Sequence, residues 1–210
     1  MRGVSNNSDN NKPIPNSLSV NKQRQRQINC PVLVTERLVL RTPHIQDVDA
    51  IADLANNRHI SAMLTKMPFP YNRKHAMEFI ERAIAGDMGY CVYAITLGTS
   101  GEVIGCCGIQ DNPETGGLEL GCWIGEAYWN NGYATEAILA LIDTAFRVSD
   151  IDVLYIGCHQ LNVRMLRVIQ KSGFRYLKTV KRVSLAVGTS SIELYGLDRM
   201  TWINLRSKCA

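Results

Sequence analysis

The segment from Leu118 to Val148 changes its hydrophobic period from two residues to between three and four across a short turn. Before the turn, apolar and other residues alternate from Leu118 to Ile124, which is typical of a half-buried strand. After it, apolar residues recur at helical intervals and predict a helix from about Gly132 to Val148. A second apolar run, Val153 to Cys158, follows this helix. The sequence therefore predicts a right-handed strand, helix and strand crossover that contains two parallel strands.

The turn itself, Glu126 to Ala137 (EAYWNNGYATEA), predicts an anion site. The start of a helix presents unpaired N–H groups and a partial positive charge, and Gly132 has no Cβ to block a bulky anion. P-loop and dinucleotide-binding glycine patterns do not fit, because only one glycine is present and Tyr133, Ala134 and Thr135 follow it. The expected anion is a phosphate or a pyrophosphate.

Three segments resemble the GNAT acyltransferase superfamily. The turn resembles its acyl-CoA loop, Gln/Arg-x-x-Gly-x-Gly/Ala, which reads here from Trp129 to Ala134 with Trp129 in place of Gln or Arg. Thr35 to Arg41 (TERLVLR) resembles the opening strand of the ribosomal-protein N-acetyltransferase (RimJ/RimL-like) branch. Asn162 to Phe174 (NVRMLRVIQKSGF) resembles the second CoA-binding helix of that branch. The resemblance extends over roughly residues 32 to 200 and implies acetyl-CoA as the acyl donor.

The resemblance implies an α+β fold of the GNAT type. Its central sheet is mixed and largely antiparallel, with about six to seven strands, a splayed parallel pair and about four flanking helices. From the sequence, strands are expected at residues 38–41, 90–97, 103–109, 118–124, 153–158, 176–186 and 192–197. The pantetheine arm of CoA would lie in the gap between the splayed strands.

On the same resemblance, backbone groups of Trp123 and Ile124 would pair with pantetheine. The amides of the turn would hold the pyrophosphate; these belong to Asn130, Asn131, Gly132, Tyr133, Ala134 and Thr135. Asn162 would either contact the cofactor or only cap the second CoA helix.

Acetyl transfer requires a deprotonated amine, a polarised carbonyl and a proton for the leaving thiolate. Glu119 is the candidate base, acting through water, although a solvated strand residue or an ion-pair partner remains an alternative. Oxyanion polarisation would fall to a backbone N–H such as that of Ile124. The family's usual acid positions hold Ile169 and Met165. Tyr133, Tyr155, Cys158 and His159 are near enough in sequence to act instead, and His159, at a strand end, is the candidate proton donor. Positioning alone can supply about 7–11 kcal/mol, so weak acid–base groups can suffice.

Composition limits the other possibilities. Residues 1–30 are polar and predict a disordered tail before an acetyltransferase domain at 31–210. The net charge of +4 without a dense basic stripe argues against nucleic acid as a partner. The seven cysteines are odd in number and lie mostly in apolar runs, which favours free thiols and a cytoplasmic location. No metal-ligand spacing and no membrane-spanning apolar run is present.

Three functions remain open at this stage. The leading one is an N-acetyltransferase that acts on a primary amine, either a protein N-terminus or a small metabolite. A GNAT-fold module that binds acyl-CoA without turnover is the second, and a ribosome or RNA contact made by the basic run at 22–26 is the third. The basic and apolar segment 58–71 favours a peptide or a neutral or acidic amine. The acyl chain length and a homodimeric state are left open.

Overall fold

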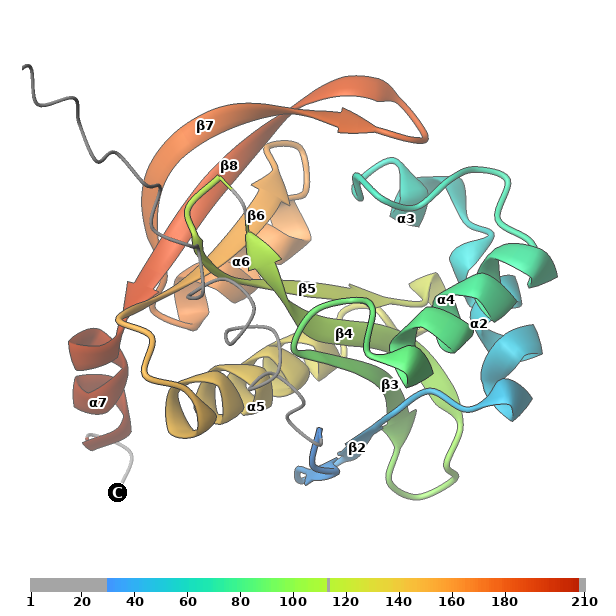
Figure 1. Ribbon diagram of the computed structural model, residues 1–210, viewed down its shortest axis with the longest axis horizontal. Coiled ribbons are helices and arrows are strands. Elements are labelled where there is room, and N and C mark those ends of the chain that lie inside the picture. The colour runs from blue at the N-terminus through green and yellow to red at the C-terminus, as the bar shows by residue number, and fades with distance from the viewer. Residues whose placement is uncertain (1–29, 113, 208–210) are drawn as a thin grey trace, which may run out of the picture.

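An eight-stranded sheet runs through the molecule in the order β1-β2-β3-β4-β5-β6-β8-β7 (Figure 1). The structure is a computed structural model that describes residues 30–112 and 114–207. The strands are β1 (Leu33–Val34), β2 (Leu38–Arg41), β3 (Cys91–Leu97), β4 (Val103–Asn112), β5 (Gly117–Ile124), β6 (Val153–His159), β7 (Arg175–Ser184) and β8 (Gly188–Asp198). All neighbouring pairs are antiparallel except β5 and β6. The predicted mixed GNAT-type sheet with one parallel pair is confirmed.

The parallel pair is short. Only Leu118, Glu119 and Leu120 of β5 pair with β6, although β5 continues to Ile124 and β6 continues to His159. Beyond Leu120 the two strands separate, so their carboxyl ends border a gap in the sheet. This is the predicted splay.

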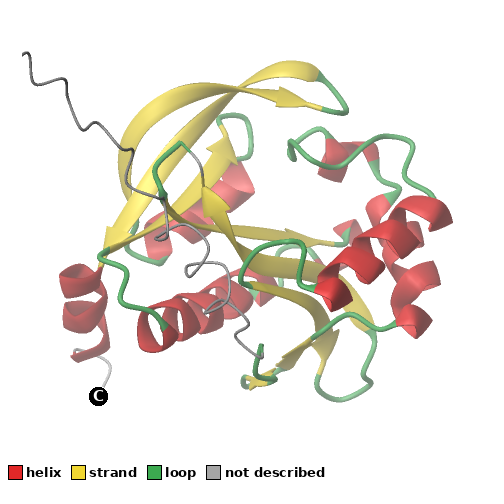
Figure 2. Cartoon of the chain, in the orientation of Figure 1, coloured by secondary structure: helices red, strands yellow, loops and turns green. Residues whose placement is uncertain are grey.

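Helices cover both faces of the sheet (Figure 2). They are α2 (Val48–Ala55), α3 (Arg58–Ser61), α4 (Arg73–Ala85), α5 (Tyr133–Val148), α6 (Val163–Lys171) and α7 (Arg199–Ser207), with 3-10 turns η1 (Ile45–Asp47) and η2 (Glu126–Tyr128). Asparagine side chains cap three of these helices: Asn57 at α3, Asn72 at α4 and Asn162 at α6. Asp198 accepts from the Thr201 N–H at the start of α7.

Two apolar clusters lie on opposite faces of the sheet. The larger one buries the helix α5, including Ile138, Leu141 and Phe146, against the strands. The smaller one buries α2 and α4 against β4, through residues such as Ile51 and Ile80. Helix α5 connects β5 to β6, so its packing fixes where the gap opens.

The β7–β8 hairpin is long and arches from the sheet toward the loop that follows α3 (Figure 1). At its tip, the Leu185 N–H donates to Thr65 O at 3.0 Å and Ser184 Oγ donates to Leu64 O at 3.0 Å. The hairpin therefore bridges the end of the gap and the segment after α3.

Several expectations needed correction. The sheet has eight strands rather than six or seven, because the two-residue β1 has too few residues to show a period. The segment 58–71 has no helical period and was expected to be a loop, but it begins with helix α3. Cys30 and Cys91 form a disulfide, so the expectation of free thiols is wrong for these two residues. Cys106, Cys107, Cys122 and Cys158 are free and buried.

The predicted tail at 1–30 lies almost wholly outside the described residues, as does the basic run at 22–26. In the part of the chain that the structure describes, no helix is long and apolar enough to cross a bilayer.

Candidate acetyl-CoA site

The edge of β5 supplies free backbone groups to the gap. The Gly125 N–H donates to Ile104 O, and the register between β4 and β5 is unbroken from that point. Backbone bonding alternates along an antiparallel pair, so the Trp123 backbone bonds to β4 while Cys122 and Ile124 direct theirs to the gap. Of the two residues predicted to pair with pantetheine, Ile124 directs its backbone groups to the gap, whereas the Trp123 backbone bonds to β4.

The side chain of Trp129 occupies one of these backbone groups, the carbonyl of Ile124. Its indole Nε1 donates to Ile124 O at 2.7 Å, which leaves the Ile124 N–H directed at the gap. The guanidinium of Arg164, on α6, lies 4.6 Å from the centre of the Trp129 ring. Trp129, the one departure from the family's loop pattern, thus connects the loop with β5 and with α6.

The loop before α5 has the geometry of an anion cradle. Asn130 and Gly132 adopt left-handed backbone conformations, with φ of 64° and 82°, and Gly132 is the N-cap of α5. The Asn131 side chain donates to Tyr128 O at 3.2 Å and to Trp129 O at 3.1 Å, which fixes the turn. The amides of Tyr133, Ala134 and Thr135 then belong to the first turn of α5, where backbone N–H groups have no helical partner.

A cavity of about 330 Å³ lies where the two strands have separated. The carboxyl end of β6 lines it with Cys158 and His159, and the start of α6 lines it with Asn162 and Met165. Glu119 of β5 lies on the same cavity. The structure therefore brings both predicted catalytic residues and Asn162 together around one space.

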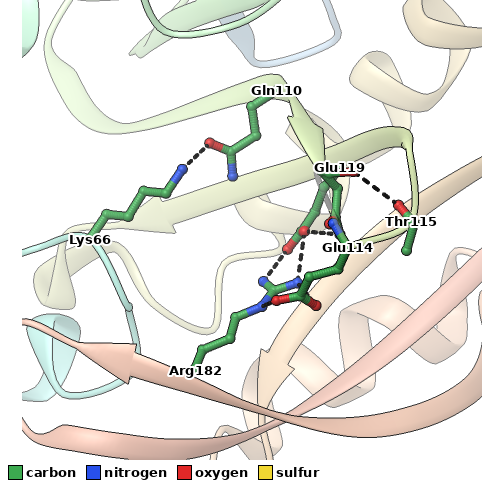
Figure 3. Close-up of polar contacts among 7 residues, drawn as sticks. Lys66, Gln110, Glu114, Thr115, Glu119 and Arg182 are labelled. Carbon is green, nitrogen blue, oxygen red and sulfur yellow. Dashed lines mark hydrogen bonds and ion pairs between the residues drawn. The ribbon is translucent and has the colours of Figure 1, made fainter.

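Glu119 is buried and ion-paired (Figure 3). Arg182, from β7, donates to both Glu119 oxygens at 2.8 and 3.0 Å and also binds Glu114. Asn112 adds a third donor at 2.6 Å. Gly157 makes room for this pair, because a Cβ there would lie 2.8 Å from Glu119 Oε1. Glu119 is therefore an ion-pair partner, which was one of the alternatives, and it also lines the cavity.

Burial by itself would lower the pKa of Arg182, but its hydrogen bonds to Glu119 and Glu114 raise it above the ordinary value of an arginine. The guanidinium stays charged and neutralises Glu119.

His159 is held in one tautomer. Its Nδ1 accepts from the Leu161 N–H at 3.2 Å, which requires a lone pair on Nδ1. A neutral ring then carries its proton on Nε2.

Cys158, another residue near the gap, is a poorer proton donor. Burial raises the pKa of its thiol to about 12, with a further contribution from Glu193. An ordinary thiol has a pKa of about 8.5, so Cys158 would not readily protonate a thiolate of that kind.

Asn162 performs its capping role. Its Oδ1 accepts from the Met165 N–H at 3.2 Å, which satisfies a free donor at the start of α6. Among the described residues its Nδ2 group has no hydrogen-bond acceptor, so the amide remains available to a ligand in the cavity.

A second cavity, of about 740 Å³, lies between the sheet and α4 and shares the residues around Gly121 with the first. A Cβ built on Gly121 would meet no atom within 4 Å, so the passage between the cavities is open there. Lys66 donates to Gln110 at 2.9 Å beside this passage (Figure 3). The second cavity is lined mostly by apolar side chains such as Met67, Phe79 and the Trp123 ring.

The comparisons with known proteins decide the family. The family model described as "Acetyltransferase (GNAT) domain" matches residues 37–175, which is more than half of the chain. The chain belongs to the GNAT acetyltransferase family. The protein is a GNAT-type N-acetyltransferase, and most of the site described above lies within the matched residues, whereas Arg182 and the rest of the β7–β8 hairpin follow them.

Relatives and solved structures agree with this assignment. An uncharacterized N-acetyltransferase, p20 of Bacillus licheniformis, is 25% identical over 148 residues, covering 68% of this chain and 82% of that protein. The self-immunity acetyltransferase MccE, solved in complex with acetyl-CoA and AMP, shares the GNAT fold with a TM-score of 0.67, 18% identity and coverage of 78% and 93%. The ribosomal-protein acetyltransferase RimL, solved with coenzyme A, shares it with a TM-score of 0.68, 18% identity and coverage of 80% and 97%.

Two residues of this GNAT site gave no sequence signal. Arg182 lies 63 residues from Glu119 in the chain, so their pairing depends on the arch of the β7–β8 hairpin. Cys122 resembles a core residue because its side chain is buried, while its backbone faces the gap. Within the described residues, no group of three or more His, Cys, Asp or Glu side chains could hold a metal ion.

Proposed function

We propose that this GNAT protein transfers an acetyl group from acetyl-CoA to a primary amine by direct attack in a ternary complex. One observation carries the proposal: the separated ends of β5 and β6 join the loop of Asn130 to Thr135 to a cavity that contains Glu119 and His159. A long donor with a diphosphate at one end and a thioester at the other fits this order of features.

The donor would be held mainly by backbone groups. The amides from Asn130 to Thr135 would bind the pyrophosphate at the start of α5. The free edge of β5 at Cys122 and Ile124 would pair with the amides of pantetheine, and Asn162 Nδ2 would bind it from the α6 side. Because Trp129 binds Ile124 O, the N–H is the group of Ile124 that is left to pair with pantetheine. The Cys122 N–H, which also faces the gap and lies nearer to Glu119 along β5, is then the candidate to polarise the thioester carbonyl in place of the Ile124 N–H.

The reaction requires two proton movements. The acceptor nitrogen attacks the thioester carbon, the carbon–sulfur bond breaks, and the amine loses a proton while the thiolate gains one. Glu119 would receive the amine proton through water at Oε1, which accepts one hydrogen bond, whereas Oε2 accepts two. The Nε2–H of His159 would donate a hydrogen bond to the sulfur as negative charge develops on it.

The acceptor would enter through the second cavity and present its amine beside Gly121. A mostly apolar cavity of this size accommodates either the first residues of a protein N-terminus or a small-molecule amine. The RimJ/RimL-like segments and the fold shared with RimL support the first of these, as a ribosomal-protein-like N-terminus.

A binding module without turnover is the second candidate. Two observations favour it. The position of the family's usual acid holds Ile169, which is fully buried and has no acidic group, and Glu119 is already bound in an ion pair. Both candidates require acetyl-CoA binding, so they differ only in turnover.

The test is calorimetric titration with acetyl-CoA, followed by an assay of free-thiol release over a panel of peptide N-termini and small amines. Binding with thiol release supports the enzyme and ranks its acceptors. Binding with no release from any member of the panel favours the module, and absence of binding contradicts both candidates.

A further inference from the structure

Arg37 lies in the turn between β1 and β2, yet its guanidinium packs against the loop before α5. Its Nη1 donates to Asn131 O at 2.9 Å, across 94 residues of sequence. A Cβ built on Gly132 would lie 3.3 Å from Arg37 Nη2, and the guanidinium carbon lies 4.8 Å from the centre of the Tyr133 ring. Arg37 therefore contacts three consecutive residues of the anion cradle.

Glu136, in the first turn of α5, fixes the orientation of Arg37. The Nε and Nη2 atoms of Arg37 bind Glu136 Oε2 at 2.8 and 2.7 Å. The Arg37 N–H and Thr35 Oγ1 donate to the other oxygen at 2.8 and 2.6 Å. Without Arg37, a carboxylate in this position would repel an anion held by the cradle, so the pair removes that repulsion.

The guanidinium retains donors for a ligand. Arginine has five N–H donors in a planar fork; the Nε–H of Arg37 donates to Glu136, one N–H on Nη1 donates to Asn131, and Nη2 lies within ion-pair distance of Glu136. Among the described residues, Nη1 and Nη2 therefore each keep at least one N–H group without a hydrogen-bond acceptor. The side chain is 45% exposed. Two N–H groups on adjacent nitrogens can bind two oxygens of one phosphate group.

We propose that Arg37 is a further binding residue of the cradle and contacts the pyrophosphate of CoA with these two donors. The pyrophosphate is the favoured group because Nη2 lies beside Gly132, where the helix N–H groups converge. This inference rests on the proposed use of acetyl-CoA, and it assigns to the donor a side-chain contact that the loop sequence does not contain.

The experiment compares the wild-type protein with Arg37→Ala and Arg37→Lys by calorimetric titration of three ligands: CoA, dephospho-CoA and pantetheine. Arg37→Ala should weaken CoA and dephospho-CoA alike, on the order of ten- to a hundredfold, since a hydrogen bond to a charged group is lost. Pantetheine has no pyrophosphate, so its affinity should not change. The CoA affinity of Arg37→Lys should lie between those of the wild-type protein and Arg37→Ala, because one ammonium cannot bind Glu136, Asn131 and a phosphate together.

Arg73→Ala is the matched control. Arg73 is also an exposed arginine in an ion pair, with Asp49, and its loss removes the same charge far from the cradle. This variant should leave all three affinities within about twofold. Thermal unfolding without ligand shows whether each variant is folded, and if Arg37→Ala does not fold, Arg37→Lys decides.

Three results would overturn the assignment. Unchanged CoA affinity in a folded Arg37 variant would mean that the residue makes no contact. A loss for CoA but not for dephospho-CoA would place Arg37 at the 3′-phosphate, and an equal loss for pantetheine would indicate a general disturbance of the site. A wild-type protein that does not bind CoA would instead contradict the proposed function.

Discussion

Some polar side chains of this protein are buried in ion pairs, and a residue in such a pair makes several hydrogen bonds at once. Asp47 is 6% exposed and accepts from both terminal nitrogens of Arg41, at 2.7 and 2.8 Å. It also accepts from the His44 N–H at 2.7 Å. These contacts join the end of β2 to η1, at the entrance to α2, far from the proposed chemistry.

Asp47→Asn should therefore lower the free energy of unfolding by about 1.5–3 kcal/mol, since hydrogen bonds to a charged group are lost. Burial alone would raise the pKa of Asp47, but the hydrogen bonds from Arg41 and His44 lower it below the ordinary value of 3.8. Its contribution is thus complete above about pH 3.8 and is lost as the pH falls further. Denaturant unfolding between pH 2 and 7 measures this for both proteins.

Asp49→Asn is the control, because Asp49 pairs with Arg73 at an exposed position. It should change the stability by less than about 1 kcal/mol. An equal effect of the two substitutions would contradict the role given to the Arg41–Asp47 pair.

Gly157 is the second residue with a specific prediction. In Gly157→Ala the added Cβ would lie 2.8 Å from Glu119 Oε1 and 3.0 Å from Arg182 Nη1, so the pair must shift. We expect a stability loss of about 1–3 kcal/mol and a lower kcat, with acetyl-CoA affinity nearly unchanged. Steady-state kinetics and calorimetry measure the two effects separately.

Gly121→Ala is the stability control, since a Cβ there meets no atom within 4 Å. It should unfold at nearly the wild-type temperature. A Gly157→Ala protein with wild-type kcat would show that the position of the Glu119–Arg182 pair does not affect turnover.

At the scale of elements, Asn162, the N-cap of α6, combines a structural and a binding role. Asn162→Ala removes the cap and should cost about 0.5–2 kcal/mol, whereas Asn162→Ser retains a capping oxygen and most of the stability. Both variants lack Nδ2, so both should bind acetyl-CoA more weakly if that group contacts the donor. Thermal unfolding and calorimetry on the same samples distinguish the roles, and wild-type affinity in Asn162→Ser would reduce Asn162 to a cap.

The elements with a clear hydrophobic period could be predicted from the sequence. The strand from Leu118 to Ile124, the helix to Val148 and the strand that follows were all placed within one or two residues. Strand β1 and helix α3 have two and four residues, which is too short for any period to appear. Their formation depends on pairing with β2 and on the Asn57 cap, which are tertiary and local contacts that composition does not encode.

The residues of the candidate site also divide into those that the sequence indicates and those that only the fold brings together. The cradle residues follow one another in the chain, and their glycine and helix-start pattern could be recognised directly. Arg37 and Arg182 approach their partners across 99 and 63 residues, so only the folded sheet brings them there. Trp123 was assigned to the gap on the family resemblance, but the direction of a backbone group depends on the register with β4.

At the scale of the whole molecule, the Cys30–Cys91 disulfide joins the first described residue to β3. A thiol titration of the denatured, unreduced protein should therefore detect two thiols fewer than the seven cysteines of the sequence. After reduction, all seven should react. Seven reactive thiols before reduction would contradict the disulfide and restore the expectation of free cysteines throughout.

The separation of β5 from β6 also has a mechanical consequence. Three residue pairs join the first five strands of the sheet to its last three, and this seam has fewer pairs than any other interface between described neighbouring strands except β1–β2. A pantetheine chain lying in the gap would act as an additional strand and join the two parts of the sheet on either side of this seam. Bound donor should then slow amide exchange on both sides of the seam at once, and the fold would gain rigidity from the same molecule that it consumes.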